Sequence, residues 1–163
     1  MRPDRHKIIC CLLIFVIFGA TFYHIGGHVG SVPETVKTAE ASPASYKDNL
    51  WLLARVIQGE AGGEPFLGKV AVGAVILNRM RSSSFPNTLA GVIFQPYAFE
   101  SVARGTIWWF RPSRDSLRAA AAALAGWDPT YGALYFWNPA KPVNPWMWTR
   151  RIITQIGRHI FAR

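Results

Sequence analysis

The fold is decided by the stretch Leu53-Ala54-Arg55-Val56-Ile57-Gln58-Gly59-Glu60-Ala61-Gly62-Gly63-Glu64-Pro65. Leu53, Val56 and Ile57 recur at helical spacing, so Glu60 comes at the end of an apolar-periodic helix. The small residues around Glu60 leave open space and let other backbone approach closely. Burial of a carboxyl group among apolar neighbours favours its protonated form, which can donate a proton near neutral pH. The stretch therefore predicts a helix that carries a proton-donating acid into a cleft.

The remaining pattern predicts a helical body followed by a small β element. Ser45 and Asp48 resemble a capping box, so we expect a first helix over 45–58. Further helices are expected over 65–80, 88–93 and 115–124. The segment Val70–Leu77 is too uniformly apolar for a surface helix. Two β-type runs, 133–137 and 156–161, could pair across the proline-rich loop 139–145. The predicted fold class is α+β with a small antiparallel β element.

The first 25 residues have the features of a targeting segment. Arg2, Arg5 and Lys7 precede an apolar run over 8–23, which places positive charge on the cytoplasmic side. The run is long for a signal-peptide core and short for a transmembrane helix, and an Ala39-Glu40-Ala41 site lies far downstream. These features favour a single-pass membrane anchor over a cleaved signal peptide. Residues 26–45 are predicted to form a linker, and 46–163 a single domain.

Charge in the predicted domain limits its partners. Residues 46–163 hold fourteen Lys/Arg and six Asp/Glu, a net +8 of the chain's +9. A basic surface can bind nucleic acid, anionic lipid or an acidic polymer. The targeting segment argues against nucleic acid and favours the bacterial envelope. Both cysteines, Cys10 and Cys11, lie in the apolar run, so the domain can form neither a disulfide nor a cysteine-based metal site.

Local structure accounts for half of the carboxylates in the domain. Asp48 and Asp115 fall at predicted helix starts, where acids stabilise the helix dipole, and Asp128 precedes a proline and is expected to organise a turn. Glu64 lies just before the second helix and could cap or orient it. On the residues alone, Glu60 could also be a buried acid satisfied by backbone amides. The candidates for chemistry are Glu60, Glu64 and Glu100.

Short motifs recur in a characteristic order along the domain. They begin with Ala54-Arg55, Gly59-Glu60-Ala61, Gly63-Glu64-Pro65, Gly68, Ala71-Val72 and Val75-Ile76-Leu77-Asn78-Arg79. They continue through Phe85-Pro86-Asn87-Thr88, Gly91-Val92-Ile93, Gln95-Pro96 and Ala98-Phe99. They end with Gly126-Trp127-Asp128-Pro129, Gly132 to Phe136, Asn138-Pro139 and Ile156 to Phe161. From Tyr46 onward the chain thus resembles the SleB-type cell wall hydrolases, the spore cortex-lytic enzymes.

This resemblance implies a lysozyme- or transglycosylase-like fold that cleaves peptidoglycan outside the cytoplasm. The substrate is the spore cortex or the cell wall, and the resemblance favours cortex lysis during germination. It implies cleavage between N-acetylmuramic acid and N-acetylglucosamine with a 1,6-anhydro product, for which Glu60 matches the acid. Most glycosidases need two carboxylates. A lytic transglycosylase needs one, because the 6-hydroxyl of the sugar replaces water as the nucleophile. No protein partner is indicated.

Other functions stay open at this point. A hydrolytic muramidase could use Glu100 or Glu64 as a second carboxylate, and a non-catalytic murein-binding module could keep the fold. A basic membrane protein without sugar binding would leave the motifs unexplained. A zinc amidase needs several His, Glu or Cys ligands, whereas the domain has His159 as its single histidine. We therefore expect no metal and no cofactor, and the intact Glu60 favours an enzyme.

Aromatic and amide side chains supply the predicted substrate contacts. Sugar rings stack on aromatic faces, and amides can bind N-acetyl and hydroxyl groups. Aromatic residues in or beside loops with polar neighbours are the better candidates. The predicted substrate-binding residues are Glu64, Gln95, Tyr97, Phe99, Tyr135, Asn138 and Trp148.

Overall fold

The computed structural model describes residues 42–109 and 111–163. The predicted membrane segment, residues 1–25, and the linker up to residue 41 lie outside the described residues. Among the residues that are described, the helices are too short or too polar for any of them to cross a membrane.

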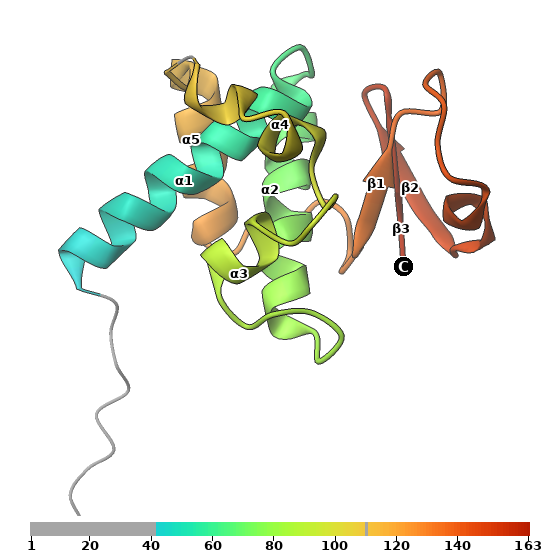
Figure 1. Ribbon diagram of the computed structural model, residues 1–163, viewed down its shortest axis with the longest axis horizontal. Helices are drawn as coiled ribbons and strands as arrows, with labels where there is room; N and C mark the ends of the chain where they lie inside the picture. Colours follow the sequence, from blue (N-terminus) through green and yellow to red (C-terminus); the bar gives the residue numbers. More distant parts are fainter. Residues whose placement is uncertain (1–41, 110) are drawn as a thin grey trace, which may run out of the picture. The chain divides into compact units, whose positions relative to one another are not determined.

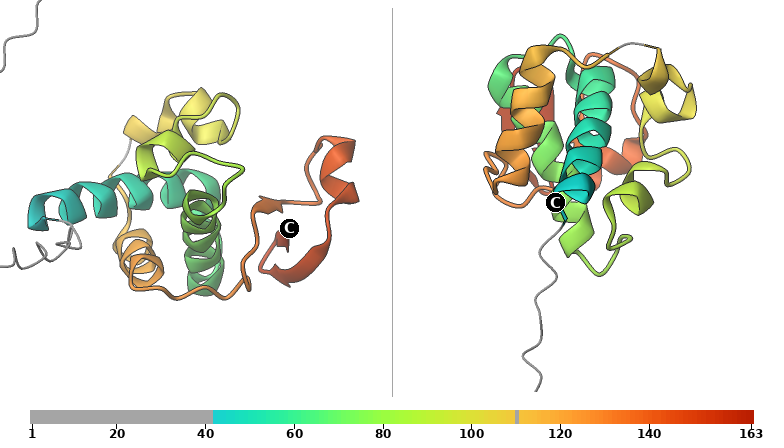
Figure 2. Two further views of the ribbon diagram at one scale, coloured as in Figure 1. Left: turned by 90° about the horizontal axis from the view of Figure 1, so that it is seen from below. Right: turned by 90° about the vertical axis from the view of Figure 1, so that its left-hand side faces the viewer.

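The helical part contains α1 (Pro43–Ala61), α2 (Phe66–Arg81), α3 (Leu89–Ile93), α4 (Glu100–Ala103) and α5 (Arg114–Leu124). A 3-10 turn, η1 (Thr106–Trp108), follows α4. Figure 1 shows these helices gathered around α2. In both views of Figure 2, α5 and the α3–α4 segment lie on opposite sides of α1. The expected helices over 65–80, 88–93 and 115–124 are confirmed, while α4 and η1 were not predicted.

The first helix differs from the prediction at both ends. Ser42, and not Ser45, is its N-cap, and the Ser42 side chain accepts a hydrogen bond from the Ser45 backbone N–H. Proline in the first turn suits this start, because the helix does not need that N–H group. The helix continues to Ala61 because Gly62 still has helical backbone angles. Glu60 therefore belongs to the last helical turn, whereas we expected the helix to end near Gln58.

Helix α2 is buried on nearly all sides and forms the centre of the core. Val70, Val72, Val75 and Ile76 are fully buried, as the apolar run predicts. Full burial of each such side chain contributes roughly 1.5–3 kcal/mol relative to exposure. The helix contacts α1, α3 and α5, and both outer strands of the sheet. The alanine-rich face of α5 packs closely on this centre.

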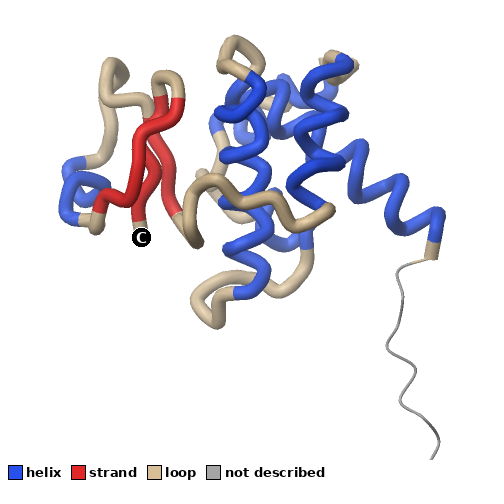
Figure 3. Tube along the Cα trace, turned by 180° about the vertical axis from the view of Figure 1, so that it is seen from behind, coloured by secondary structure: helices blue, strands red, loops and turns tan. Residues whose placement is uncertain are grey.

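The three strands are β1 (Tyr135–Trp137), β2 (Ile152–Ile156) and β3 (His159–Ala162), in the spatial order β1-β3-β2. All pairs are antiparallel, and Figure 3 shows the strands together beside the helices. The predicted pairing is confirmed by Phe136, which lies opposite Phe161. The expected strand over 156–161 is wrong in detail, since it joins the end of β2, a turn and β3. A second 3-10 turn, η2 (Pro145–Thr149), lies within the proline-rich region.

An ion pair between an exposed arginine and a buried glutamate ties the β2–β3 turn to the corner between α1 and α2. Glu64 has a side chain that is 2 % exposed, and its Oε1 accepts a 2.7 Å bond from Arg158 Nε. Its Oε2 accepts a 2.9 Å bond from the Arg158 backbone N–H. A Cβ atom at Gly157 would overlap Glu64 Oε2, and Gly157 has φ of +60°. Glycine at this turn thus serves both the left-handed backbone and the approach of the carboxylate.

We predict that Gly157→Ala lowers the free energy of unfolding by roughly 2 kcal/mol or more, because it adds steric overlap to backbone strain. Gly105→Ala is the matched control, since Gly105 has φ of +68° and nothing within 4 Å of the added Cβ. The control should cost only about 1 kcal/mol. Urea unfolding measures both values, and equal losses would show that the Glu64 contact adds nothing.

Candidate active site

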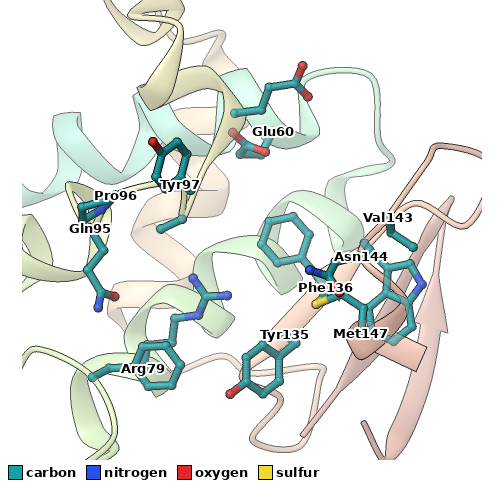
Figure 4. Close-up of a pocket in the computed structure, with 14 residues that line it drawn as sticks. Glu60, Arg79, Gln95, Pro96, Tyr97, Tyr135, Phe136, Val143, Asn144 and Met147 are labelled. Carbon is teal, nitrogen blue, oxygen red and sulfur yellow. The ribbon is translucent and has the colours of Figure 1, made fainter. Parts of the chain in front are cut away.

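An open groove of about 530 Å³ lies between the helices and the sheet. Its base is formed by Glu60 from the end of α1 and Arg79 from the end of α2. One wall is the segment 95–98 that follows α3, and the other is β1 together with 143–147. Figure 4 shows the side chains of both walls around these two charged residues. The groove therefore brings together four segments that are distant in sequence.

Glu60 is held in place by Ser101 of α4. Its Oε1 accepts hydrogen bonds from the Ser101 backbone N–H at 2.9 Å and from Ser101 Oγ at 2.7 Å. Within the described residues, Oε2 has no hydrogen-bond partner. A Cβ atom at Gly59 would overlap the Ser101 side chain, so glycine beside the acid permits this contact. Two donors on one oxygen fix the carboxyl group and leave the other oxygen free for chemistry.

Arg79 is the buried cation of the groove. Its Nε donates to the carbonyl oxygen of Leu134 at 2.7 Å, which ties the end of α2 to the chain that enters β1. Burial lowers its pKa to about 10, although the nearby Tyr135 and Glu60 oppose this change. The guanidinium group thus stays charged at neutral pH.

Tyr97 has an unusual conformation at the groove. Its side chain is 96 % exposed and its φ is +60°, a left-handed value that is uncommon for residues other than glycine. Such backbone strain is typical of binding sites, where the surrounding structure maintains it. Gln95 from the same segment adds an amide. The wall therefore presents an aromatic ring and an amide to a ligand.

The opposite wall combines aromatic, amide and apolar groups. Tyr135 and Phe136 come from β1, and Asn144 and Met147 from the following segment. Tyr135 packs edge-on against Trp146, with ring centroids 5.2 Å apart. Asn144 also caps η2, where its Oδ1 accepts a bond from the Trp146 backbone N–H. The cap fixes this amide at the groove.

Three of the seven predicted substrate-binding residues line the groove: Gln95, Tyr97 and Tyr135. The other four do not line it, and each has a different contact. Phe99 is 2 % exposed and stacks on Phe136, and Asn138 organises a turn by accepting from the Ala140 backbone N–H. Trp148 packs edge-on against Trp137, and Glu64 is held by Arg158. Their sequence context showed loops with polar neighbours, which does not reveal the direction of a side chain.

The other carboxylates differ in their availability. Glu100 lines the groove, but its Oε1 forms an exposed 2.9 Å ion pair with Arg104. Asp128 organises a turn, as predicted, by accepting bonds from Thr130, Gly132 and Asn78. The helix-start explanation fails for Asp48, because α1 begins at Pro43. No group of three His, Cys, Asp or Glu side chains in the described part of the chain could hold a metal ion.

His159 lies on β3, which is the central strand of the sheet. It is buried against Phe136 and Phe161. Burial lowers its pKa, although the negative charge of Glu64 opposes this change. These contacts fit a structural role.

Two important residues were missed from the sequence. Ser101 carries no motif that links it to Glu60, although the glycine beside that acid indicated a close approach. Arg79 belongs to a motif, and its position after eight apolar residues and an asparagine was the signal that could have found it.

Fold and groove define a mostly helical protein with an open, aromatic-lined groove around a fixed acid. The Cell Wall Hydrolase family profile matches residues 63–162. The chain therefore belongs to the cell wall hydrolase family, and the resemblance to SleB-type members is confirmed.

Known relatives agree with this assignment. The spore cortex-lytic enzyme of Bacillus cereus is 50 % identical over 122 residues, which are 74 % of this chain and 47 % of that protein. The chain thus spans about half the length of the curated relatives it matches first.

Two solved structures have the same fold. The catalytic domain of the Bacillus cereus SleB protein has a TM-score of 0.67 and 50 % identity, covering 72 % of this chain and 91 % of that one. The catalytic domain of the germination-specific lytic transglycosylase SleB from Bacillus anthracis has a TM-score of 0.68 and 49 % identity, covering 72 % and 95 %.

The Glu64–Arg158 contact predicts a pH dependence of stability. Burial alone would raise the pKa of Glu64, but hydrogen bonds from Arg158 and the charges of His159 and Arg158 hold it below 4.5. A carboxylate with a lowered pKa contributes stability above its unfolded value, and this is lost as the pH falls through the folded value. We predict that Glu64→Gln is less stable at neutral pH but loses less further stability on acidification below about pH 4.5.

The measurement is the urea midpoint of both proteins from neutral to acid pH. Burial would raise the pKa of Asp128 as well, yet its bonds from Thr130, Asn78 and Gly132 lower it. Asp128 therefore accounts for a remaining acid sensitivity in Glu64→Gln. Parallel curves for the two proteins would contradict the assignment to Glu64.

Proposed function

We propose that this chain is a lytic transglycosylase of bacterial peptidoglycan that uses Glu60 as its single general acid and base. The observation that carries the proposal is the geometry of Glu60. Ser101 holds Oε1 through two hydrogen bonds, while Oε2 has no partner within the described residues, beside a groove with aromatic walls. An acid held in this way is suited to proton transfer at one oxygen.

The first step breaks the bond between N-acetylmuramic acid and N-acetylglucosamine. The protonated Oε2 of Glu60 donates its proton to the glycosidic oxygen, which leaves with the bonding electron pair. Positive charge develops at C1 of the muramic acid ring, and Glu60 becomes a carboxylate that stabilises it.

The second step closes the product ring. The Glu60 carboxylate removes the proton from the 6-hydroxyl of the same sugar, and the oxygen attacks C1. A 1,6-anhydro ring forms, and Glu60 is protonated again. No water is consumed, so a second carboxylate to activate water is not required.

The groove walls would bind the glycan strand. Tyr97 and Tyr135 offer aromatic faces for sugar rings, and Gln95 and Asn144 offer amides for N-acetyl and hydroxyl groups. The groove is open, as cleavage within a long polymer requires. The names of the relatives support cortex peptidoglycan as the substrate, with cleavage during spore germination. We infer that the domain acts outside the cytoplasm, secreted or anchored by the N-terminal segment.

A hydrolytic muramidase is the second candidate, because Glu100 lines the same groove as Glu60. In that mechanism Glu100 would leave Arg104 and activate water or stabilise the sugar cation. Glu64 does not suit this role, since both of its oxygens are occupied by Arg158.

We predict that Glu60→Gln lowers the rate of peptidoglycan cleavage by at least ~10²-fold, because the amide cannot donate the proton. Release of soluble muropeptides from purified sacculi measures the rate. Mass spectrometry of the wild-type products should find anhydromuramic ends without reducing muramic acid.

Glu100→Gln is the matched control and should cost much less, because only one acid is essential. Reducing ends together with an inactive Glu100→Gln would identify a two-carboxylate hydrolase. A wild-type protein that binds sacculi without releasing fragments would be a non-catalytic murein-binding module.

We predict that Ser101→Ala lowers kcat by about 10-fold with little change in KM, since a positioning error reduces rate more than binding. The loss is smaller than for Glu60→Gln because the backbone N–H of residue 101 still binds Oε1. Ser84→Ala, in an exposed loop, is the control and should keep the wild-type rate. An unchanged kcat for Ser101→Ala would mean that the Oγ contact does not position the acid.

A further inference from the structure

Arg79 is a buried cation without a carboxylate partner. It is 8 % exposed, and within residues 42–109 and 111–163 no Asp or Glu lies within ion-pair distance of it. Burying a charge without a counter-ion costs free energy. The described arginines that form ion pairs, Arg104, Arg118 and Arg158, have much more exposed side chains. The unneutralised charge of Arg79 therefore requires an explanation.

Aromatic rings surround the guanidinium group and restrict what can reach it. Its central carbon lies 5.2 Å from the Phe85 ring, 5.3 Å from Phe99 and 5.8 Å from Tyr135. These contacts stabilise a cation and keep water from its faces. Nε donates to Leu134, and within the described part of the chain the two terminal nitrogens have no hydrogen-bond partner. Figure 4 shows the guanidinium group between Gln95 and Phe136, at the groove.

The chemistry of a fixed guanidinium indicates its ligand. Its planar donors match a carboxylate, which they can bind through two parallel hydrogen bonds. Glu60 is uncharged when it is ready to donate a proton, so Arg79 then has no counter-ion from the acid. A positive charge develops on the sugar during bond cleavage, and an unneutralised cation nearby would oppose it. A carboxylate brought by the substrate removes this repulsion.

We propose that Arg79 binds a carboxylate on the lactyl substituent of muramic acid, or on the peptide attached to it, and thereby selects glycans that carry this charge. The inference rests on the proposed function for its substrate. Arg79 is then a specificity-determining residue that places the muramic acid ring beside Glu60.

The test measures binding in the Glu60→Gln background, so that it does not depend on catalysis. The probes are soluble glycan chains with free lactyl carboxylates, the same chains after methylamidation, and chains that still bear peptides. Calorimetry should find the carboxylate chains bound at least about 10-fold more tightly than the amidated chains, the size of a charge-assisted hydrogen bond. Adding Arg79→Gln should abolish this preference, and Arg79→Lys should restore part of it.

Arg81→Gln is the matched control, because Arg81 is exposed two residues further along α2 and does not line the groove. It should keep the preference. A preference shown only by peptide-bearing chains would place the carboxylate on the peptide. The proposal is overturned if Arg79→Gln keeps the preference, or if it weakens charged and amidated chains equally, as a structural or N-acetyl-binding role would. Cleavage of sacculi by Glu60→Gln would refute the proposed function alone, because the outcome for Arg79 is a ratio of affinities for charged and amidated chains.

Discussion

Removal of α2 from water on nearly all of its faces is the constraint on which the structure depends. An apolar helix of this kind needs neighbours on every side, and α1, α3, α5 and the sheet provide them. Polar residues at the two ends of the helix then attach the sheet. Glu64 precedes the first turn and holds Arg158 of the β2–β3 turn, whereas Arg79 in the last turn holds Leu134 before β1. The groove is the space between parts that α2 keeps together.

One acid in this groove is better prepared for chemistry than the others. The contact between Ser101 and Glu60 joins α4 to the last turn of α1, so the acid is fixed by two separate elements. Glu100 faces the same groove but is paired with Arg104, and Glu64 is used to attach the sheet. Burial and pairing thus divide three nearby glutamates among different tasks. This division agrees with the proposed transglycosylase reaction, which needs one acid and the 6-hydroxyl of the substrate.

Much of the fold could be predicted, because periodicity and caps are local signals. The buried character of α2, the turn at Asp128 and the pairing of β1 with β3 followed from short segments. The division of residues 156–161 into two strands could not be seen, because the turn depends on a carboxylate distant in sequence. Glu60 was predicted as the acid from its motif, whereas its contact with Ser101 and the aromatic surroundings of Arg79 arise only when distant segments meet. Trp148 and Phe99 were misplaced because an aromatic side chain beside a loop can point to either side.

Leu134 links the stability of the sheet to the shape of the groove. Its backbone N–H bonds to Ala162 of β3, while its carbonyl oxygen receives the Arg79 side chain. The sheet has three strands, so we expect it to open locally before the helical core unfolds. Such opening would release Arg79 from Tyr135 and remove one groove wall at the same time. Thermal inactivation would then begin with detachment of the sheet, at a lower temperature than melting of the helices.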